Sequence, residues 1–509
     1  MLLHFYSALG ERHVEVSQAH LDSMALAGGL RHLGIGKGDV VAVQMPTCYE
    51  TLLTYLAILH TGATLLPVIH IYGATELQFV LQQSKAKALI IPDRWHKLDF
   101  VERWRNAQPL PDLQHLIVFG DDMPVGATPL RDLLQGDPAD IELPGGIADC
   151  GADDVCLLLY TSGTTSAPKG VQHTHNTLRA EWQDYEYDAP AYIKTGPFLN
   201  TFPAGHIGGF LYFTRPIYQG IPSVFLDQWD AHQAARLIEQ HKVEHTGGPQ
   251  YFLTTLMQAI EAQPYDISSL TAFGMGAAGI TPASIELTDR MGFPGGRVYG
   301  SSEVPTVTYW TPDMPLQQRA NTDGKIASRC EVRIIDDTCN DLPVGEAGEI
   351  VVRAPEMFVG YLDPQLDIDS FLPGGWFRTG DIGCVDAAGF LTITDRKKDI
   401  IIRGGENISS KEVEDAIARH PAIAEVAVVA MPDEKYGERV CAFAMVRRHQ
   451  TVTLADIQQH FAALGLAKQK CPEFLHVVDD LPRTAGGKVK KFELRQSLRD
   501  SVRTTTGRE

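Results

Sequence analysis

The stretch that decides the fold is VVAVQMPTCYETLLTYLAILHTGATLLPV, residues 40–68. It opens within a short strand expected over Asp39–Val43, continues with a helical pattern over Tyr49–His60 and ends in a second expected strand over Thr64–Val68. Short buried strands that alternate with helices are typical of a largely parallel sheet covered by helices. The stretch therefore predicts an α/β fold.

The same alternation extends in both directions along the chain. A helical pattern over Leu21–Leu33 precedes the stretch, and another over Thr75–Gln83 follows it. The pattern returns between residues 224 and 298, where helices are expected over Ala231–His241 and Tyr251–Ala262. We expect these segments to form a large N-terminal domain of layered, parallel-rich sheets with helices.

The pattern changes after about Asp323. Short strands such as Gly348–Arg353 are separated there by Gly, Pro and Asp turns, which predicts a small β unit. Further on, a helix is expected to begin after Ser409-Ser410, with Glu412 and Glu414 in its first turn. We therefore expect a large domain over residues 1–397, followed by a small α+β C-terminal domain over residues 398–509.

The composition excludes several classes of protein. A chain of 509 residues with 44% hydrophobic and 21% charged residues is typical of a globular protein of more than one domain. The net charge of -19 opposes a role in nucleic-acid binding, which needs a basic surface. No apolar run approaches the roughly 18 residues of a membrane span, and the N-terminus lacks the pattern of a signal peptide. The eight Cys form no Cys-x-x-Cys pair, so neither zinc nor a disulfide framework is expected, and the cytoplasm is the expected compartment.

The strongest local motif is Tyr160-Thr161-Ser162-Gly163-Thr164-Thr165-Ser166-Ala167-Pro168-Lys169-Gly170, which follows an apolar strand over Val155–Leu159. Hydroxyl groups, a glycine and a lysine at the end of a strand can surround a polyphosphate. The spacing differs from that of a P-loop. Taken alone, the motif could also be a flexible Ser/Thr linker.

Three further segments are weaker when each is taken alone. Tyr299-Gly300-Ser301-Ser302-Glu303 places a carboxylate beside hydroxyls, which suits Mg²⁺ held against phosphate, although such a sequence is more often a turn. Thr379-Gly380-Asp381, with Arg396 further on, offers a carboxylate that suits a ribose diol. Pro482–Lys488 contains two glycines before a lone lysine and could equally be an exposed basic turn.

In this order and at these separations, the four segments resemble the adenylate-forming superfamily, which contains acyl- and aryl-CoA synthetases, free-standing adenylation domains and firefly luciferase. The resemblance covers essentially the whole chain and is greatest to fatty- or aryl-acid CoA ligases. It implies that ATP activates a carboxylic acid to an acyl-adenylate with release of pyrophosphate, and that the acyl group then passes to coenzyme A. ATP, Mg²⁺ and coenzyme A are the cofactor and co-substrates that it implies.

The resemblance also implies that the large domain binds the acid and ATP, that the small domain is mobile, and that each matching residue has a role. Contacts to ATP or AMP are expected from Thr161, Ser162, Gly163, Thr164, Thr165, Lys169, Gly276, Ala277, Ala278, Tyr299, Gly300, Ser301, Asp381 and Arg396. Tyr299 is expected to stack on adenine, and Glu303 to hold Mg²⁺. Two positions depart from the family pattern: Ser166 replaces a usual glycine, and Ser302 replaces the usual threonine at the α-phosphate but keeps the hydroxyl.

The C-terminal segments are implied to serve two half-reactions in turn. Lys488 matches the lysine that contacts the carboxylate and the α-phosphate during adenylation, where a cation offsets the charge of two anions. Lys398 matches the hinge about which the small domain rotates. After rotation, Gly404 and Gly405 would face the site, and their lack of side chains suits a pantetheine thiol that passes close to the backbone.

The segment Phe202–Gly209 resembles the family segment at the entrance of the acyl pocket, where CoA ligases commonly carry a histidine, here His206. Ala204 and Gly205 offer no carboxylate for the α-ammonium of an amino acid, so we expect an apolar acid. Gly248 and Gly274 are further pocket candidates, and their small size favours a medium-chain, alicyclic or aromatic acid. Taken alone, His206 could equally be a hydrogen-bonded core histidine.

Several alternatives stay open at this point. The adenylate could pass to a carrier protein or an amine, or be oxidised as in luciferase. An inactive ligand-binding pseudo-enzyme is a different class, and the joint presence of Lys169, Glu303, Asp381, Arg396 and Lys488 argues against it. The expected partners are small molecules and no nucleic acid, and both a monomer and a homodimer are compatible with the sequence.

Overall fold

The protein is described from a computed structural model of the whole chain. The structure describes residues 1–509 except 136–141, 144–145, 148–149, 162–167, 189–195, 277–279, 404–405, 434, 465, 484–488 and 507–509. Of residues 142–143, 146–147, 184–187, 406–407 and 499–506 it describes the backbone alone. Of the predicted site residues, Ser162, Gly163, Thr164, Thr165, Ala277, Ala278, Gly404, Gly405 and Lys488 lie outside the described residues.

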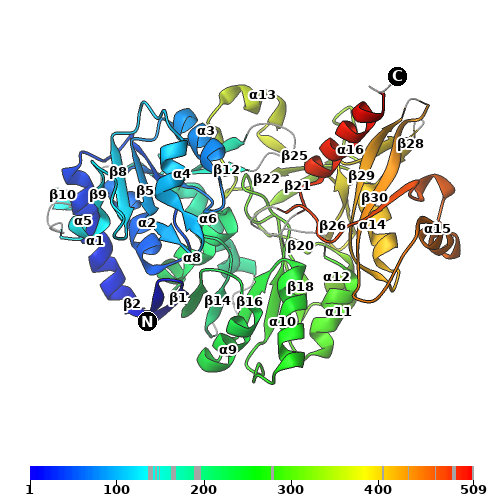
Figure 1. Ribbon diagram of the computed structural model, residues 1–509, viewed down its shortest axis with the longest axis horizontal. Helices are drawn as coiled ribbons and strands as arrows, with labels where there is room; N and C mark the ends of the chain where they lie inside the picture. The colour runs from blue at the N-terminus through cyan, green and yellow to red at the C-terminus, as the bar shows by residue number, and fades with distance from the viewer. Residues whose placement is uncertain are drawn as a thin grey trace.

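An eight-stranded sheet contains the stretch with which the sequence analysis began (Figure 1). Its strands, in spatial order, are β23 (Gly360–Tyr361), β13 (Lys169–Thr174), β12 (Val155–Thr161), β4 (Thr64–Pro67), β3 (Val40–Val43), β5 (Ala88–Pro92), β8 (His115–Phe119) and β9 (Thr128–Pro129). Strand β3 pairs in parallel with β4 on one side and with β5 on the other. The predicted parallel arrangement is therefore confirmed for this part of the chain.

A seven-stranded sheet carries the second set of alternating strands and helices. Its strands, in spatial order, are β18 (Gly295–Arg297), β17 (Ala272–Met275), β16 (His245–Gly248), β14 (Phe198–Asn200), β15 (Ser223–Leu226), β1 (Leu2–Ser7) and β2 (Gly10–Glu15). All neighbouring strands from β18 to β1 pair in parallel, and β2 closes the edge as an antiparallel hairpin with β1. The first residues of the chain are thereby tied to a segment more than two hundred positions away.

The main hydrophobic core contains residues of both large sheets and of the helices around them. Phe5 and Phe225 come from the seven-stranded sheet, Val41 and Leu65 from the eight-stranded one, and all four side chains are almost completely buried in one cluster. The same cluster contains residues of α1 (Val16–His32), α2 (Tyr49–Thr61) and α8 (Ile207–Gln219). The other helices before residue 322 that bear on the argument are α3 (Ala74–Ser84), α4 (Phe100–Asn106), α6 (His175–Asp188), α9 (Ala231–His241), α10 (Gln250–Ala262), α11 (Pro282–Arg290) and α12 (Leu316–Asn321).

Two smaller sheets follow in the C-terminal part of the chain. The first contains β21 (Glu331–Ile335), β22 (Gly348–Arg353), β25 (Trp376–Val385), β24 (Phe371–Leu372) and β26 (Leu391–Arg396). The second contains β28 (Glu406–Ile408), β27 (Ile401–Arg403), β30 (Gly437–Val446), β29 (Ile423–Asp433) and β31 (Phe474–Val477). It is accompanied by α14 (Ser410–Ala418), α15 (Leu454–Ala463) and α16 (Lys491–Thr506), coloured orange to red in Figure 1.

These sheets confirm the predicted fold class, a large N-terminal α/β part followed by a smaller α+β part. Lys398 lies between the last strand of one sheet, β26, and the first strand of the next, β27. The boundary between residues 397 and 398 stays a prediction, as does the role of Lys398 as a hinge. None of the helices in the described part of the chain is long and apolar enough to span a membrane.

Candidate active site

A tight turn after β18 carries the motif Tyr299-Gly300-Ser301-Ser302-Glu303. The Ser301 backbone N–H donates to the Val304 carbonyl at 2.8 Å, and the Ser301 hydroxyl accepts from the backbone N–H groups of Glu303 and Val304, each at 3.2 Å. A side chain at Gly300 would place its Cβ only 1.9 Å from the Pro305 carbonyl oxygen. The turn therefore needs glycine at this position and holds the residues on either side of it in fixed places.

On one side of the turn, three of the residues predicted to bind the nucleoside meet in a buried cluster. The Tyr299 hydroxyl donates to Asp381 Oδ2 at 2.6 Å, and Arg396 Nε lies 2.8 Å from Asp381 Oδ1. Asp381 and Arg396 face each other across the β25–β26 ladder, which fixes their pairing. Burial and the neighbouring Asp381 raise the pKa of Tyr299 well above its usual value, so the phenol remains a donor.

Arg396 keeps its charge within this cluster. Burial alone would lower the pKa of its guanidinium, but the charge of Asp381 outweighs burial and raises that pKa. Asp381 thus has one oxygen held by a phenol and one by a guanidinium. The structure therefore brings together Tyr299, Asp381 and Arg396, which the sequence analysis assigned to the nucleotide. Their contact with ribose stays a prediction.

On the other side of the turn, Glu303 and Lys169 converge on Tyr361. The Tyr361 hydroxyl donates to Glu303 Oε1 at 2.8 Å, and Lys169 Nζ lies 4.9 Å from the centre of the Tyr361 ring. Lys169 pairs with Thr161 across the β12–β13 hairpin, so the ends of the Ser/Thr-rich motif are adjacent. The sequence analysis missed Tyr361, which carries no motif of its own and reaches the site because β23 pairs with β13.

A buried histidine supports the turn from behind. His173 Nε2 lies 2.7 Å from the Ser302 carbonyl oxygen, and its Nδ1 lies 3.1 Å from the Thr177 hydroxyl. Burial lowers the pKa of His173 to about 4, so the ring is neutral near pH 7. A carbonyl oxygen can only accept, so Nε2 carries the proton. His173 therefore orients the backbone at Ser302 without adding charge to the site.

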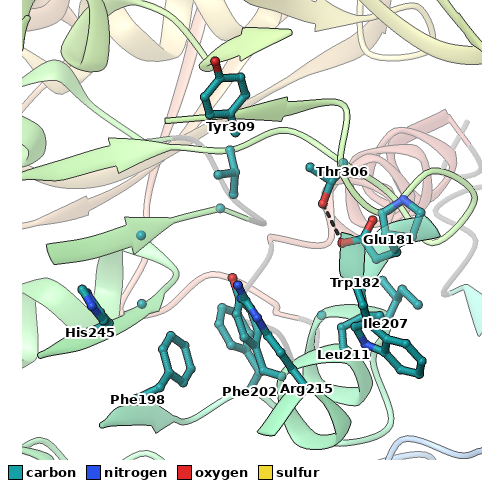
Figure 2. A pocket seen from close by; sticks show the side chains of 18 of the residues that line it. Glu181, Trp182, Phe198, Phe202, Ile207, Leu211, Arg215, His245, Thr306 and Tyr309 are labelled. Atoms are coloured by element: carbon teal, nitrogen blue, oxygen red, sulfur yellow. Dashed lines mark hydrogen bonds between the residues drawn. The ribbon is translucent and has the colours of Figure 1, made fainter. Parts of the chain in front are cut away.

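A cavity of 280 Å³ extends from the turn along the face of the seven-stranded sheet (Figure 2). Gly300, Ser301 and Ser302 line one end of it, and Ser223 and His245 belong to its lining as well. Most of its walls are apolar or aromatic and come from Trp182, Phe198, Phe202, Ile207, Leu211, Tyr212 and Ile221. An apolar cavity with a few polar groups at its mouth is typical of a small-molecule site.

The predicted pocket residues lie in or next to this cavity. Gly274 and Gly276 line it. Gly247 lines it as well, whereas Gly248 faces Phe252, whose ring lies 2.3 Å from the position of a Cβ on that glycine. His206 immediately precedes α8 and the lining residue Ile207. Its Nε2 is buried without a hydrogen-bond partner among the described residues, and its assignment to the acyl pocket stays a prediction.

Two carboxylates, an arginine and a histidine of the lining were missed by the sequence analysis. Glu181, which is almost completely buried, accepts a hydrogen bond from the Thr306 hydroxyl at 2.8 Å (Figure 2). Asp188 accepts from the Ser328 backbone N–H at 3.0 Å. The other two are Arg215 and His245. Their positions on α6, α8 and β16 follow no local motif, and only the packing of these elements brings them together.

The donor set around Glu303 fits a magnesium ion carried with a polyphosphate. No cluster of three or more carboxylate, histidine or cysteine ligands occurs in the described part of the chain. Mg²⁺ usually keeps several waters and is bound by one or two carboxylates together with substrate phosphates. Glu303 beside the hydroxyls of Ser301 and Ser302 matches that requirement.

The segment that carries Lys488 is anchored by described residues on both sides. Arg483 and Val489 form an antiparallel bridge, and Arg483 also forms an ion pair with Glu425 at 2.5 Å. Burial raises the pKa of Tyr251 on α10, and Arg483 acts in the opposite direction, so the two side chains are near each other. The C-terminal part of the chain therefore reaches α10 of the large N-terminal part.

The histidines around the site predict how stability depends on pH. Burial lowers the pKa of His173, His206 and His245 to about 4. In the unfolded chain the pKa of histidine is about 6.5, so the free energy of unfolding is not reduced by these rings above that pH. As the pH falls from there towards 4, the unfolded state binds protons that the folded state does not, and the free energy of unfolding decreases by up to about 1.4 kcal/mol per pH unit for each ring. We expect the melting temperature to fall steeply below pH 6.

The variant His173→Asn removes one of these titrating rings and so measures its contribution. Its melting temperature should depend less on pH between 6 and 4.5 than that of the wild type, whereas the same change at the exposed His232 should leave the dependence unaltered. Thermal unfolding followed by circular dichroism at several pH values measures both. Identical pH dependence in His173→Asn and the wild type would contradict the prediction.

Comparisons with known proteins agree with this geometry. The model of the AMP-binding enzyme family matches residues 5–362, and that of the AMP-binding enzyme C-terminal domain matches residues 412–488. Over 490 residues the chain is 36% identical to the medium-chain fatty-acid–CoA ligase of Escherichia coli (strain K12), covering 93% of this chain and 84% of that relative. Over 490 residues it is 31% identical to the indoleacetate–CoA ligase of Aromatoleum aromaticum, covering 95% of this chain and 93% of the relative.

A solved structure shows the same fold. The ATP-bound crystal structure of MatB from Rhodopseudomonas palustris superimposes with a TM-score of 0.87 at 26% sequence identity, covering 98% of this chain and 96% of that one. The resemblance to adenylate-forming enzymes that rested on four short segments is thereby confirmed along the whole length. The chain belongs to the AMP-binding enzyme family.

Proposed function

We propose that the protein is an AMP-forming acyl–CoA ligase. A carboxylate oxygen of the acid attacks the α-phosphorus of ATP, the bond to pyrophosphate breaks, and acyl-AMP forms. The thiol sulfur of coenzyme A then attacks the acyl carbon, AMP leaves and the thioester remains. One observation carries this proposal. The cluster of Tyr299, Asp381 and Arg396 and the group of Glu303, Tyr361 and Lys169 lie on either side of one turn, and this turn lies at the mouth of an apolar cavity.

Within this proposal, the described residues divide the binding of ATP between them. Asp381 accepts from the ribose hydroxyls while Arg396 and Tyr299 hold its carboxylate in place. Lys169 faces the polyphosphate from the end of the β12–β13 hairpin. Mg²⁺, when bound beside Glu303, neutralises phosphate charge that would otherwise repel the incoming carboxylate.

The cavity supports an apolar acid of moderate size. Its volume of 280 Å³ lies near the lower end of the range of about 300–1,000 Å³ that is usual for ligand pockets. Its walls are mainly aromatic and aliphatic, which favours a medium-chain, alicyclic or aromatic acid over a long fatty chain. The two ligases named above, which by name act on a medium-chain fatty acid and on indoleacetate, support the same class.

Coenzyme A is the acceptor that we propose. A β-hairpin formed by β27 and β28 pairs Arg403 with Glu406, and Gly404 and Gly405, which lie between them, are the residues we assign to the thiol passage. A carrier protein or an amine is the alternative acceptor.

Identification of the products tests the proposal. Purified protein is incubated with ATP, Mg²⁺ and a panel of acids, with and without coenzyme A, and the products are analysed by mass spectrometry. We expect acyl-AMP without coenzyme A and an acyl-CoA thioester with it. Acyl-AMP that persists in the presence of coenzyme A, but is consumed by a phosphopantetheinylated carrier protein or an amine, would overturn the assignment of the acceptor.

A further inference from the structure

Strand β13 carries two side chains that bear on the phosphate end of the candidate active site. It begins with Lys169, whose ammonium group lies 4.9 Å from the centre of the Tyr361 ring, and His173 lies near its other end. Successive side chains of a strand alternate between its two faces, so residues 169 and 173 lie on the same face, about 13 Å apart along the strand. Val171, between them, pairs with Tyr361 in β23, which places this tyrosine on that face as well.

Hydrogen bonds at both ring nitrogens fix the orientation of His173. Nε2 donates to the Ser302 carbonyl oxygen at 2.7 Å, so Nδ1 carries no proton and can accept from the Thr177 hydroxyl at 3.1 Å. The same hydroxyl oxygen accepts from the Thr174 backbone N–H at 3.0 Å, which holds it at the start of α6. The His173 side chain is completely buried. The ring therefore has one place and one donor direction, towards Ser302.

The turn that carries Ser302 and Glu303 is tied to β13 in two ways. The Ser302 carbonyl accepts from His173, and the Glu303 carbonyl accepts from the Phe358 backbone N–H at 2.8 Å. The residue after Phe358 donates its own backbone N–H to the Gln172 carbonyl in β13, at 3.0 Å. The tie at Glu303 is made by the backbone and survives any substitution there, whereas the tie at Ser302 needs the imidazole of His173.

Loss of the imidazole would leave the partly buried Ser302 carbonyl without this donor. A carbonyl that loses its partner away from water is unfavourable, so the peptide group would turn towards another donor or admit water, and the Ser302 side chain would turn with it. Ser302 lies at the mouth of the cavity, where the acid and the α-phosphate meet in the proposed reaction. A displacement of about 1 Å can lower a rate by about a hundredfold where reacting groups must be aligned.

We propose that His173 is a positioning residue for the adenylation step. It fixes the backbone of Ser302, so that the Ser302 hydroxyl is held at the α-phosphate at a constant distance from Lys169, which lies on the same strand. His173 lies behind the turn and acts through Ser302, without touching ATP or the acid. The inference rests on the proposed function, because it names a residue through which the same site places its phosphate-binding groups.

Two substitutions of His173 test the inference by acid-dependent pyrophosphate release. His173→Leu removes the donor and should lower kcat by about ten- to a hundredfold, while the KM of the acid stays close to that of the wild type because the apolar cavity is untouched. His173→Gln keeps an N–H donor and should restore most of kcat. His460→Leu is the matched control, since it breaks a bond of the same kind, from Nε2 to the Ala416 carbonyl at 3.0 Å, and should leave kcat unchanged.

Two further readouts separate positioning from a merely structural role. Because His173 acts through Ser302, the double variant with Ser302→Ala should be no slower than the slower of the two single variants. ATP in which sulfur replaces one non-bridging oxygen of the α-phosphate exists as two diastereomers, and their rate ratio reports on the contacts at this phosphate. His173→Leu should shift that ratio in the same direction as Ser302→Ala, whereas a residue that only stabilises the fold would lower the melting temperature and leave the ratio unchanged.

The outcomes separate the inference from the proposed function. A folded His173→Leu variant with the wild-type kcat, or with the wild-type diastereomer ratio, would overturn the inference, and so would additive losses in the double variant. If His173→Leu does not fold, Thr177→Val removes the hydroxyl that orients the ring, and it should shift the ratio in the same direction by a smaller amount. The absence of pyrophosphate release by the wild type with every acid would instead overturn the proposed function.

Discussion

Replacement of Lys488 by alanine is expected to slow acid-dependent pyrophosphate release by about a hundred- to a thousandfold, the usual effect of removing one group that stabilises charge in a transition state. The family resemblance places this lysine at the carboxylate and the α-phosphate, where two anions must approach each other. The bridge between Arg483 and Val489, and the proximity of Arg483 to Tyr251, bring the flanking residues of this segment towards the large domain.

The second half-reaction should respond differently to the same change. If acyl-AMP is supplied, Lys488→Ala should form the thioester at a rate close to that of the wild type, because in the proposed mechanism the lysine serves the first step alone. Lys490→Ala is the matched control, since Lys490 forms a local ion pair with Glu493 at 2.8 Å. Undiminished pyrophosphate release by Lys488→Ala would show that another group neutralises the charge of the reacting anions.

Replacement of Glu303 by glutamine is expected to lower pyrophosphate release by about a hundredfold and to raise the Mg²⁺ concentration needed for half-maximal rate. Glutamine keeps the shape of the side chain and can still accept the hydrogen bond from Tyr361, so the turn should keep its structure. What is lost is the negative charge that Mg²⁺ prefers in its ligands.

The control for this prediction is Glu286→Gln, on the exposed surface of α11, which should leave both quantities unchanged. Tyr361→Phe removes the hydrogen bond but not the charge, and we expect a smaller loss of rate with an unaltered Mg²⁺ dependence. Titrations with Mg²⁺ at saturating ATP distinguish these cases. A Glu303→Gln variant with the wild-type Mg²⁺ dependence would contradict the assignment of Glu303.

Local sequence was sufficient for elements whose ends carry clear signals. The helix predicted over Ala231–His241 is α9, capped by the Asp230 side chain, which accepts from the Gln233 backbone N–H. Likewise, the helix expected after Ser409-Ser410 is α14, which begins at Ser410 and is capped by the Ser409 side chain. The strand predicted over Gly348–Arg353 is β22.

Elements that depend on distant partners could not be predicted in this way. Strand β1 exists because it pairs with β15, a contact that leaves no trace in its own sequence. Helix α8 was missed because it contains two glycines and Pro216, which are unfavourable inside helices. The structure explains Gly209, since a Cβ there would lie only 1.8 Å from the Pro203 carbonyl oxygen.

The candidate active site likewise contains residues that a local motif predicts and residues that only the fold brings to it. Tyr299, Asp381 and Arg396 belong to family motifs and could be named from the sequence, and the structure brings them into contact. Tyr361 and Arg215 belong to no motif, and strand pairing and the direction of one helix bring them to the site and to the cavity lining. The sequence thus predicted part of the cavity lining, such as Gly274 and Ser302, but not the side chains that the packing of α6, α8 and β16 adds to it.

The most direct test of the central claim is pyrophosphate release by the purified protein with ATP and Mg²⁺ across fatty, alicyclic, aromatic and amino acids, with and without coenzyme A. The proposed ligase should release pyrophosphate with one class of apolar acids, faster when coenzyme A is present, and form AMP and the thioester in equal amounts. Release that is fastest with amino acids, or no release with any acid, would contradict it.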